Sequence, residues 1–287
     1  MGKGKIFIDG VEGGTDSMGN TYYSRDEMWK NELDRADPTS EKGWYGKGIK
    51  YWEDVPASVD GVLGGFGHVS ASAGDARRRM TMRQVTDVDL EESELFYQTL
   101  LREGHLKLTE PGRAADCGAG IGRISKGFLC NHFKAVDLVE PVAHFLQTAE
   151  KELSGFNDGN YIQIGLQDWV PQQGLYDVIW IQWVIGHLTD EDFVAFMMRC
   201  KRGLKEDGVI VLKENACTEG FIVDKVKERR CEYPEILTKT MQEDSSVTRS
   251  AGNFAQFPQF ASDMRRINAV YLEGLCKAAG LSVVAQE

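Results

Sequence analysis

The stretch GRAADCGAGIGR, residues 112–123, decides the fold class. It starts as a short apolar run suited to a buried strand, and three glycines then precede a segment with helical periodicity. Glycines between a strand and a helix allow a tight turn, so that a ligand can approach bare backbone at the helix N-terminus. The stretch therefore predicts a nucleotide-like ligand at the carboxyl edge of a sheet.

Strand and helix patterns alternate on both sides of this stretch. Apolar runs predict further strands at 135–140, 161–165, 176–183 and 208–215. Helical patterns cover about 90–103, a segment opening at Ile121, a segment ending near Leu153, and 190–204. This alternation predicts an α/β fold of the Rossmann-like kind, a doubly wound and mostly parallel sheet with helices on both faces.

The outer parts of the chain show less regular patterns. Residues 1–43 are rich in Gly, Ser, Asp and Asn, so we expect a flexible N-terminal arm with at most a short helix near 26–33. Residues 44–287 then form the main domain, and aromatic residues among glycines predict an N-terminal helical cap over 44–105.

Composition excludes several classes of protein. Of 287 residues, 33 are basic and 44 acidic, so the net charge of −11 argues against a nucleic-acid-binding protein. No apolar run is long enough for a membrane span, and the N-terminus lacks a signal peptide. The six cysteines are scattered without metal-ligand spacing, so we expect reduced thiols, no metal site, and a cytoplasmic or nuclear location.

The glycine turn favours one of two cofactors. Both NAD and S-adenosylmethionine bind such turns, and Gly118 and Gly120 suit either. The dinucleotide pattern places a small residue where this chain has Arg123. A guanidinium would crowd a pyrophosphate but can bind the free carboxylate of a methionine moiety, which favours S-adenosylmethionine.

Polar residues follow the next two predicted strands. Glu140 ends the second strand, about 20 residues beyond the glycines, where an acidic side chain meets ribose hydroxyls. Leu166 and Gln167 follow the third strand and could clamp an adenine ring. Taken alone, Glu140 fits an exposed strand end, and residues 165–169 fit an ordinary loop.

The run IWIQWVIGHLTD, residues 179–190, ends a buried strand in groups that form hydrogen bonds. It brings Gln182, Trp183 and His187 to the edge of the sheet that carries the glycine turn, and Asn215 ends the next strand there. A single histidine is as often structural as functional at such a position.

Four blocks of this sequence resemble a known family. YWEDVPASVDGVLGGFGH, DCGAGIGRISK, YDVIWIQWVIGHLTD, and LKEN with EGFIVD are similar to the protein N-terminal Xaa-Pro-Lys N-methyltransferases, class I enzymes that use S-adenosylmethionine and release S-adenosylhomocysteine. The similarity starts at about Tyr45 and covers most of the chain beyond it. It implies cofactor contacts from Trp52, Gly118, Arg123, Glu140, Leu166, Gln167 and Gln182. The family usually has Asp where Glu140 stands.

The resemblance also implies a groove for peptides that begin Xaa-Pro-Lys or Xaa-Pro-Arg. The matching groove residues are Tyr51, Leu63, Trp183, His187, Asn215, Asp224 and Asp244. The peptide proline would pack on Trp183, and carboxylates would receive the third residue. Asp244 and His187 are the candidate catalytic bases, with Asn215 orienting the amine. A small-molecule methyltransferase and an inactive peptide-binding homologue are the alternatives.

Two segments interrupt the family pattern, at 69–84 and 226–242. Both begin with Val and end with Gln, which fits short in-frame introns retained in the coding sequence as well as surface loops. A third doubtful segment covers 251–262, and the sequence stops at LSVVAQE, where we expect the final hairpin of this fold to begin.

Overall fold

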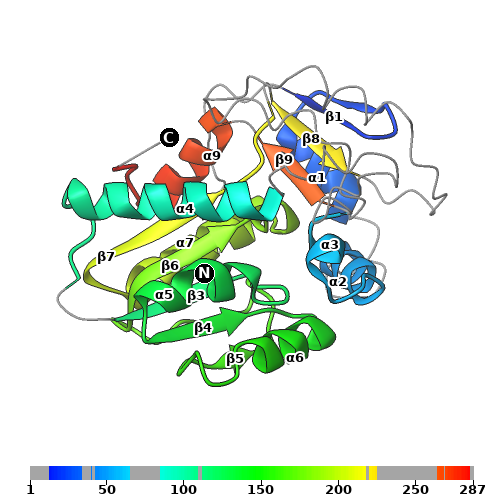
Figure 1. Cartoon of the computed structure of the whole chain (residues 1–287). Helices are drawn as coiled ribbons and strands as arrows, with labels where there is room; N and C mark the ends of the chain where they lie inside the picture. The colour runs from blue at the N-terminus through cyan, green and yellow to red at the C-terminus, as the bar shows by residue number, and fades with distance from the viewer. Residues whose placement is uncertain are drawn as a thin grey trace, which may run out of the picture.

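A five-stranded parallel sheet forms the centre of the computed structural model (Figure 1). The structure describes residues 13–33, 40, 43–64, 85–108, 112–217, 220–224, 264–267 and 269–284. The strands are β3 (Arg113–Cys117), β4 (Ala135–Val139), β5 (Tyr161–Ile162), β6 (Tyr176–Gln182) and β7 (Leu204–Lys213), in the order β5-β4-β3-β6-β7. The order reverses between β3 and β6, which is the point where open α/β sheets bind ligands.

Alternate residues of the central strands pack into two separate hydrophobic clusters. On β6, Val178 and Trp180 belong to one cluster, and Ile179 and Ile181 belong to the other. This alternation follows from the two-residue period of a strand, and each face therefore needs its own cover of helices.

Helices cover both faces of the sheet (Figure 1). One face packs against α4 (Val85–Arg102), the segment η2 (Ser125–Leu129) with α5 (Cys130–His132), and α6 (Ala143–Glu152). The other packs against α7 (Asp190–Gly203) and α9 (Ala269–Ala278). The predicted doubly wound, mostly parallel sheet is confirmed.

Several predicted boundaries shift: the helix expected at about 90–103 begins at Val85, and the strand expected at 208–215 covers Leu204–Lys213. Two other shifts have local reasons. The helix expected to open at Ile121 begins only at Arg123, because Gly122 has a φ of 77°, which a right-handed helix does not allow. The strand expected at 161–165 pairs with β4 only over Tyr161–Ile162, and the following residues turn toward the edge of the sheet.

Residues 13–33 are folded, which corrects the expectation of a flexible arm there and confirms the short helix expected near 26–33. They form β1 (Gly14–Asp16), β2 (Thr21–Tyr22) and α1 (Arg25–Leu33), in which Met28 and Trp29 are buried. A second sheet, in the order β2-β1-β8-β9, joins β1 to β8 (Phe221–Asp224) and β9 (Met264–Ile267). The strand β1 pairs with a partner about 200 residues away, so a local sequence pattern does not reveal it.

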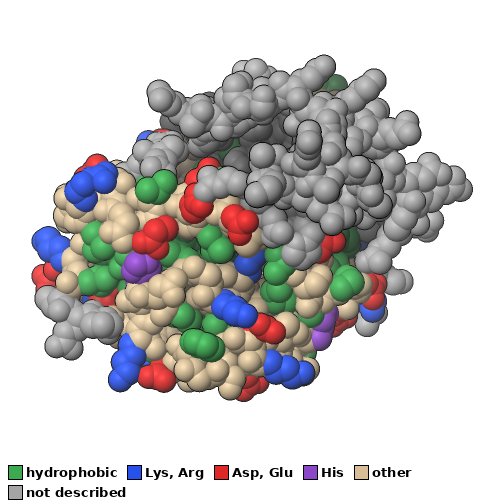
Figure 2. All heavy atoms as spheres, viewed as in Figure 1, with side chains coloured by type: hydrophobic (Ala, Val, Ile, Leu, Met, Phe, Trp, Pro, Cys, Tyr) green, Lys and Arg blue, Asp and Glu red, His purple; other side chains and the backbone are tan. Residues whose placement is uncertain are grey.

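Two helices lie where the cap is expected, α2 (Trp44–Glu53) and α3 (Val59–Val62). The helix α4, which the expected bounds of 44–105 also include, packs on the central sheet. The segments 69–84, 226–242 and 251–262 lie outside the described residues, and residues 281–284 form no strand. Over the described part of the face in Figure 2, acidic and basic side chains are interspersed. Within the described ranges, no helix has the length and apolarity needed to cross a bilayer.

Candidate active site

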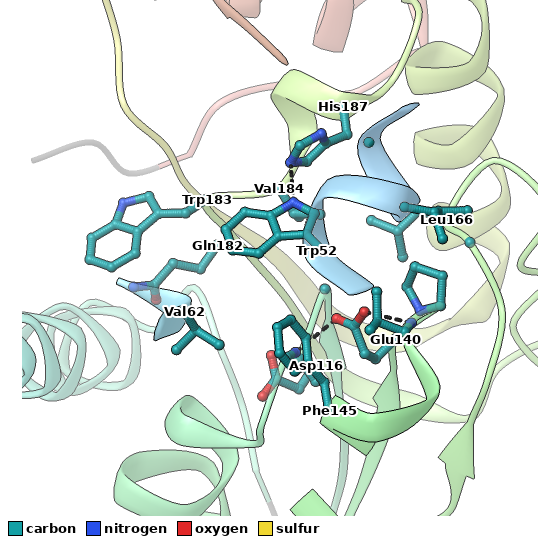
Figure 3. A pocket seen from close by; sticks show the side chains of 18 of the residues that line it. Trp52, Val62, Asp116, Glu140, Phe145, Leu166, Gln182, Trp183, Val184 and His187 are labelled. Atoms are coloured by element: carbon teal, nitrogen blue, oxygen red, sulfur yellow. Dashed lines mark hydrogen bonds between the residues drawn. The ribbon is translucent and has the colours of Figure 1, made fainter. Parts of the chain in front are cut away.

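A cavity opens at the carboxyl edge of the central sheet, beneath the cap (Figure 3). Its walls come from the turns that follow β3, β4, β5 and β6, and from α2 and α3. All eight predicted cofactor residues line it, namely Trp52, Gly118, Gly120, Arg123, Glu140, Leu166, Gln167 and Gln182. Four strand ends with their loops, and the helix α2, thus bring together residues that lie far apart in the sequence.

The glycine turn after β3 leaves room for a ligand at one position. Gly118, Gly120 and Gly122 all have positive φ angles, of 74°, 54° and 77°. A Cβ atom on Gly118 would lie 2.6 Å from the side chain of Val184, so that position is filled. A Cβ atom on Gly120 would meet nothing closer than Val62 Cγ1 at 3.7 Å. Gly120 is therefore the glycine that keeps the cavity open.

The buried carboxylate of Glu140 joins the glycine turn to the following loop. Its two oxygens accept the backbone N–H groups of Gly120 and Val142, each at 2.9 Å. Burial raises the pKa of Glu140 to about 7, against the effect of these two hydrogen bonds. Asp116 lies nearby, and burial raises its pKa to about 6. This part of the cavity thus presents two carboxyl groups.

Two other lining residues, Arg123 and Gln182, present hydrogen-bond donors. Arg123 is 9% exposed, and its Nη1 donates to Asp89 at 2.6 Å. The Nε2 of Gln182 donates to the same carboxylate at 2.8 and 2.9 Å. Asp89 lies on α4 and is missing from the predicted site. One acidic residue within VTDVDLEESE carries no local signal that separates it from its neighbours.

The loop at 165–169 is held in place by Arg199 of α7. The Arg199 guanidinium donates to the carbonyl oxygens of Leu166, Gln167 and Trp169 at 2.9, 2.9 and 2.7 Å. These bonds keep Leu166 and Gln167 on the cavity wall, where an apolar side chain and an amide suit an adenine ring.

Aromatic residues of the cap hold His187 at the cavity edge (Figure 3). The Trp44 indole N–H donates to the His187 carbonyl at 2.6 Å, and the Trp52 indole N–H donates to His187 Nε2 at 3.3 Å. In the neutral ring Nε2 is therefore the acceptor, and Nδ1 carries the hydrogen. The lone pair that would make Nε2 a base is already engaged by Trp52.

Trp183 directly follows β6 in an unusual conformation. Its φ angle is 53°, a left-handed value that a bulky residue rarely adopts. Its N–H donates to the Lys213 carbonyl at 3.0 Å, and its ring lies 5.3 Å from the Arg123 guanidinium carbon. The strained backbone places this indole beside the donor end of the cavity, which agrees with a functional role.

Residues 40–272 match the family described as AdoMet dependent proline di-methyltransferase. The chain belongs to this methyltransferase family. A similar protein from Arabidopsis thaliana, alpha N-terminal protein methyltransferase 1, is 42% identical over 251 residues, with 85% of this chain and 79% of its own covered. N-terminal Xaa-Pro-Lys N-methyltransferase 1 of Mus musculus is 44% identical over 204 residues, with 70% of this chain and 84% of its own covered.

A solved structure extends the likeness to three dimensions. It is a SAM-dependent methyltransferase from Leishmania major, 35% identical, with a TM-score of 0.73 and coverage of 98% of this chain and 91% of its own. The enzyme described here is thus an S-adenosylmethionine-dependent class I methyltransferase.

The cavity fits this cofactor by shape and by donor set. Gly120 leaves open space where any other residue would project a side chain. Arg123 and Gln182 offer donors for a carboxylate, while Glu140 offers an acceptor for hydroxyl groups. The bound cofactor supplies a methyl group on a positively charged sulfur. Within the described residues, no group of three His, Cys, Asp or Glu side chains is arranged to hold a metal ion.

The predicted peptide residues are only partly brought together. Leu63, Trp183 and His187 line the cavity, whereas Tyr51 packs edge-on against Trp52 and is not part of the lining. Asn215 follows β7, outside the cavity lining, and its N–H donates to Glu214 at 2.9 Å.

The structure gives less information on the two acidic groove residues, Asp224 and Asp244. The backbone of Asp224 ends β8, in the second sheet. Asp244 lies outside the described residues. The catalytic and peptide-binding roles of all these residues stay predictions.

Glu214 is a second site residue that the sequence did not indicate. Its carboxylate accepts the N–H groups of Ile185 at 3.0 Å and Asn215 at 2.9 Å. Burial raises the pKa of Glu214 to about 7. The side chain ties the end of β7 to η3 (Ile185–His187), and so it supports the turn that carries Trp183 and His187.

Proposed function

We propose that this enzyme methylates the free α-amino group of protein N-termini that begin Xaa-Pro-Lys or Xaa-Pro-Arg. The position of Trp183 carries the proposal. Its partly exposed indole lies on the cavity wall next to Gln182 and Arg123, held by a strained backbone. An aromatic face beside the methyl donor suits the ring of a proline at the second position. The name of the relative from Arabidopsis thaliana supports the protein N-terminus as the acceptor, and the name of the relative from Mus musculus supports the Xaa-Pro-Lys type.

The chemistry requires removal of a proton. An α-amino group has a pKa of roughly 7.7 to 8.0, so at neutral pH most of it lacks the lone pair that attacks the sulfonium. His187 Nε2 accepts from Trp52 in this arrangement, which suits a role in orienting the substrate. Asp244 is then the preferred base, and Asn215 is the residue proposed to orient the amine for in-line transfer.

Charge supports a basic peptide as the partner. The net charge is −11, which raises the local concentration of a cationic segment near the protein. Asp224 ends β8, and we propose that its carboxylate receives the third residue of the peptide. A cytoplasmic or nuclear location, and the absence of nucleic-acid and membrane partners, stay predictions.

A peptide series tests the proposal. Methyl transfer is measured with peptides that begin Ser-Pro-Lys, acetyl-Ser-Pro-Lys, Ser-Ala-Lys and Ser-Pro-Glu. We expect rapid transfer to the first, none to the acetylated peptide, and strongly reduced transfer to the last two. Equal transfer to the free and acetylated peptides would refute α-amino specificity.

Two results would favour the alternatives. Cofactor and peptide binding without turnover would indicate an inactive homologue. Cofactor binding without any peptide binding would indicate a small-molecule acceptor. In either case, variants that lack residues 226–242 show whether this segment is the cause.

A further inference from the structure

A buried carboxylate on α4 connects three side chains of the cofactor end of the site. Asp89 is 4% exposed and pairs with Arg123 at 2.6 Å and with Lys213 at 2.5 Å. The amide of Gln182 donates to both of its oxygens. Two cations and one amide thus converge on a single side chain.

The fold explains why these residues meet. Alternate side chains of a strand point to the same face, so Gln182 lies on the same face of β6 as Val178 and Trp180, which face α4. The residue paired with Gln182 on β7 is Lys213. These two side chains therefore lie next to each other on the α4 face, at the end of the sheet where the cavity opens. Asp89 lies on α4, the helix that covers this face of the sheet.

Asp89 fixes the direction of both cavity donors. The Trp180 indole N–H donates to Gln182 Oε1 at 2.9 Å, so the amide must turn its Nε2 toward Asp89. Arg123 is held by Asp89 on one side and lies over the Trp183 ring on the other. Neither donor is free to choose another rotamer without breaking a buried hydrogen bond.

Charge pairing also holds the cluster together. Asp89 carries one negative charge against the two positive charges of Arg123 and Lys213, and Lys213 also pairs with the half-exposed Glu92 at 3.7 Å. The ion pair with Asp89 keeps the Arg123 guanidinium in one orientation, from which its remaining N–H groups can donate to an anionic group in the cavity.

We propose that Asp89 is a positioning residue that aims Arg123 and Gln182 at the amino-acid end of S-adenosylmethionine. This role goes beyond the proposed function, because it concerns the cofactor and is independent of the methyl acceptor. Asp89 itself does not line the cavity, so it acts through the two donors.

Binding of two ligands distinguishes a positioning role of Asp89 from a role in overall stability. S-adenosylhomocysteine carries the amino-acid end, and 5′-methylthioadenosine keeps the adenosine and the sulfur but lacks that end. Their dissociation constants are measured by calorimetry for the wild type, Asp89→Asn and Asp87→Asn. Asp87 lies exposed on the same helix, so its variant removes the same charge without touching the cluster.

The expected result is selective. Asp89→Asn should weaken S-adenosylhomocysteine about tenfold or more, as loss of a charge-assisted hydrogen bond does, and leave 5′-methylthioadenosine within about twofold. Asp87→Asn should change neither. Equal weakening of both ligands, or no weakening of either, would overturn the proposal.

A second variant covers the case in which Asp89→Asn does not fold. Asp89→Glu keeps the charge but moves the carboxylate outward by one methylene group. Positioning predicts the same selective loss of S-adenosylhomocysteine, whereas a purely electrostatic role predicts unchanged binding. Since no peptide is used, the result does not depend on the proposed acceptor.

Discussion

Gly120 offers a sharp test of where the cofactor binds. We expect Gly120→Ala to fold and to lose cofactor affinity. The added methyl group would lie in open cavity space, 3.7 Å from Val62 Cγ1. It would therefore clash with a bound ligand and not with the protein. Forcing an extra side chain into a well-packed protein–ligand contact costs about 1 to 3 kcal/mol. The dissociation constant of the cofactor should therefore rise roughly 5- to 150-fold.

The variant also carries a backbone cost that needs its own control. Gly120 has a φ angle of 54°, where an L-residue costs about 1 to 2 kcal/mol, or roughly 2–8 °C in melting temperature. Gly104 has a φ of 75° with nothing within 4 Å of its Cβ position, so Gly104→Ala carries the strain alone.

Calorimetric titration with S-adenosylhomocysteine and a thermal melt of each variant separate the two effects. Both variants should melt earlier, and only Gly120→Ala should bind more weakly. Wild-type affinity in Gly120→Ala, or an equal loss in Gly104→Ala, would show that the cofactor does not lie over the glycine turn.

Three further predictions follow from buried groups. Because burial raises the pKa of Glu140 to about 7, and ribose hydroxyls bind its ionised form, the affinity measured by titration for S-adenosylmethionine should fall by up to about tenfold per pH unit below 7. Glu140→Gln should remove that dependence, and a pH-independent wild type would contradict it. Glu214→Ala leaves two N–H groups without their acceptor, so the KM for peptide should rise several-fold with little change in cofactor affinity; equal losses would contradict its role. Trp29→Ala should destabilise the protein by about 3 to 5 kcal/mol in denaturant unfolding, since Trp29 is 6% exposed and packs on Trp44; no change would mean that the arm is not docked.

Local sequence patterns predicted the central sheet because its signals are local. The apolar strand at Tyr176–Gln182 is buried on both faces, and the glycine turn contains the residues that its φ angles require. Most of the cofactor residues lie where the same logic places them, since parallel strands deliver their carboxyl ends to one edge. Trp52, on the helix α2, and the cofactor role of Gln182 were predicted only from the family resemblance.

Other features depend on contacts between distant segments. Asp89 meets Gln182 across 93 positions, and β1 pairs with β8 across about 200, so neither leaves a periodic signal. The role of Glu214 arises from the turn that folds back onto it. These residues become recognisable only when burial and hydrogen-bond partners are known.

The site of methylation on the peptide shows whether the α-amino group is the acceptor. A Ser-Pro-Lys peptide is incubated with the enzyme and S-adenosylmethionine, and fragment ions from tandem mass spectrometry locate the added mass. We expect every added methyl group to lie on the nitrogen of the first residue. Methylation of the lysine side chain, or of no position while the cofactor binds, would contradict it.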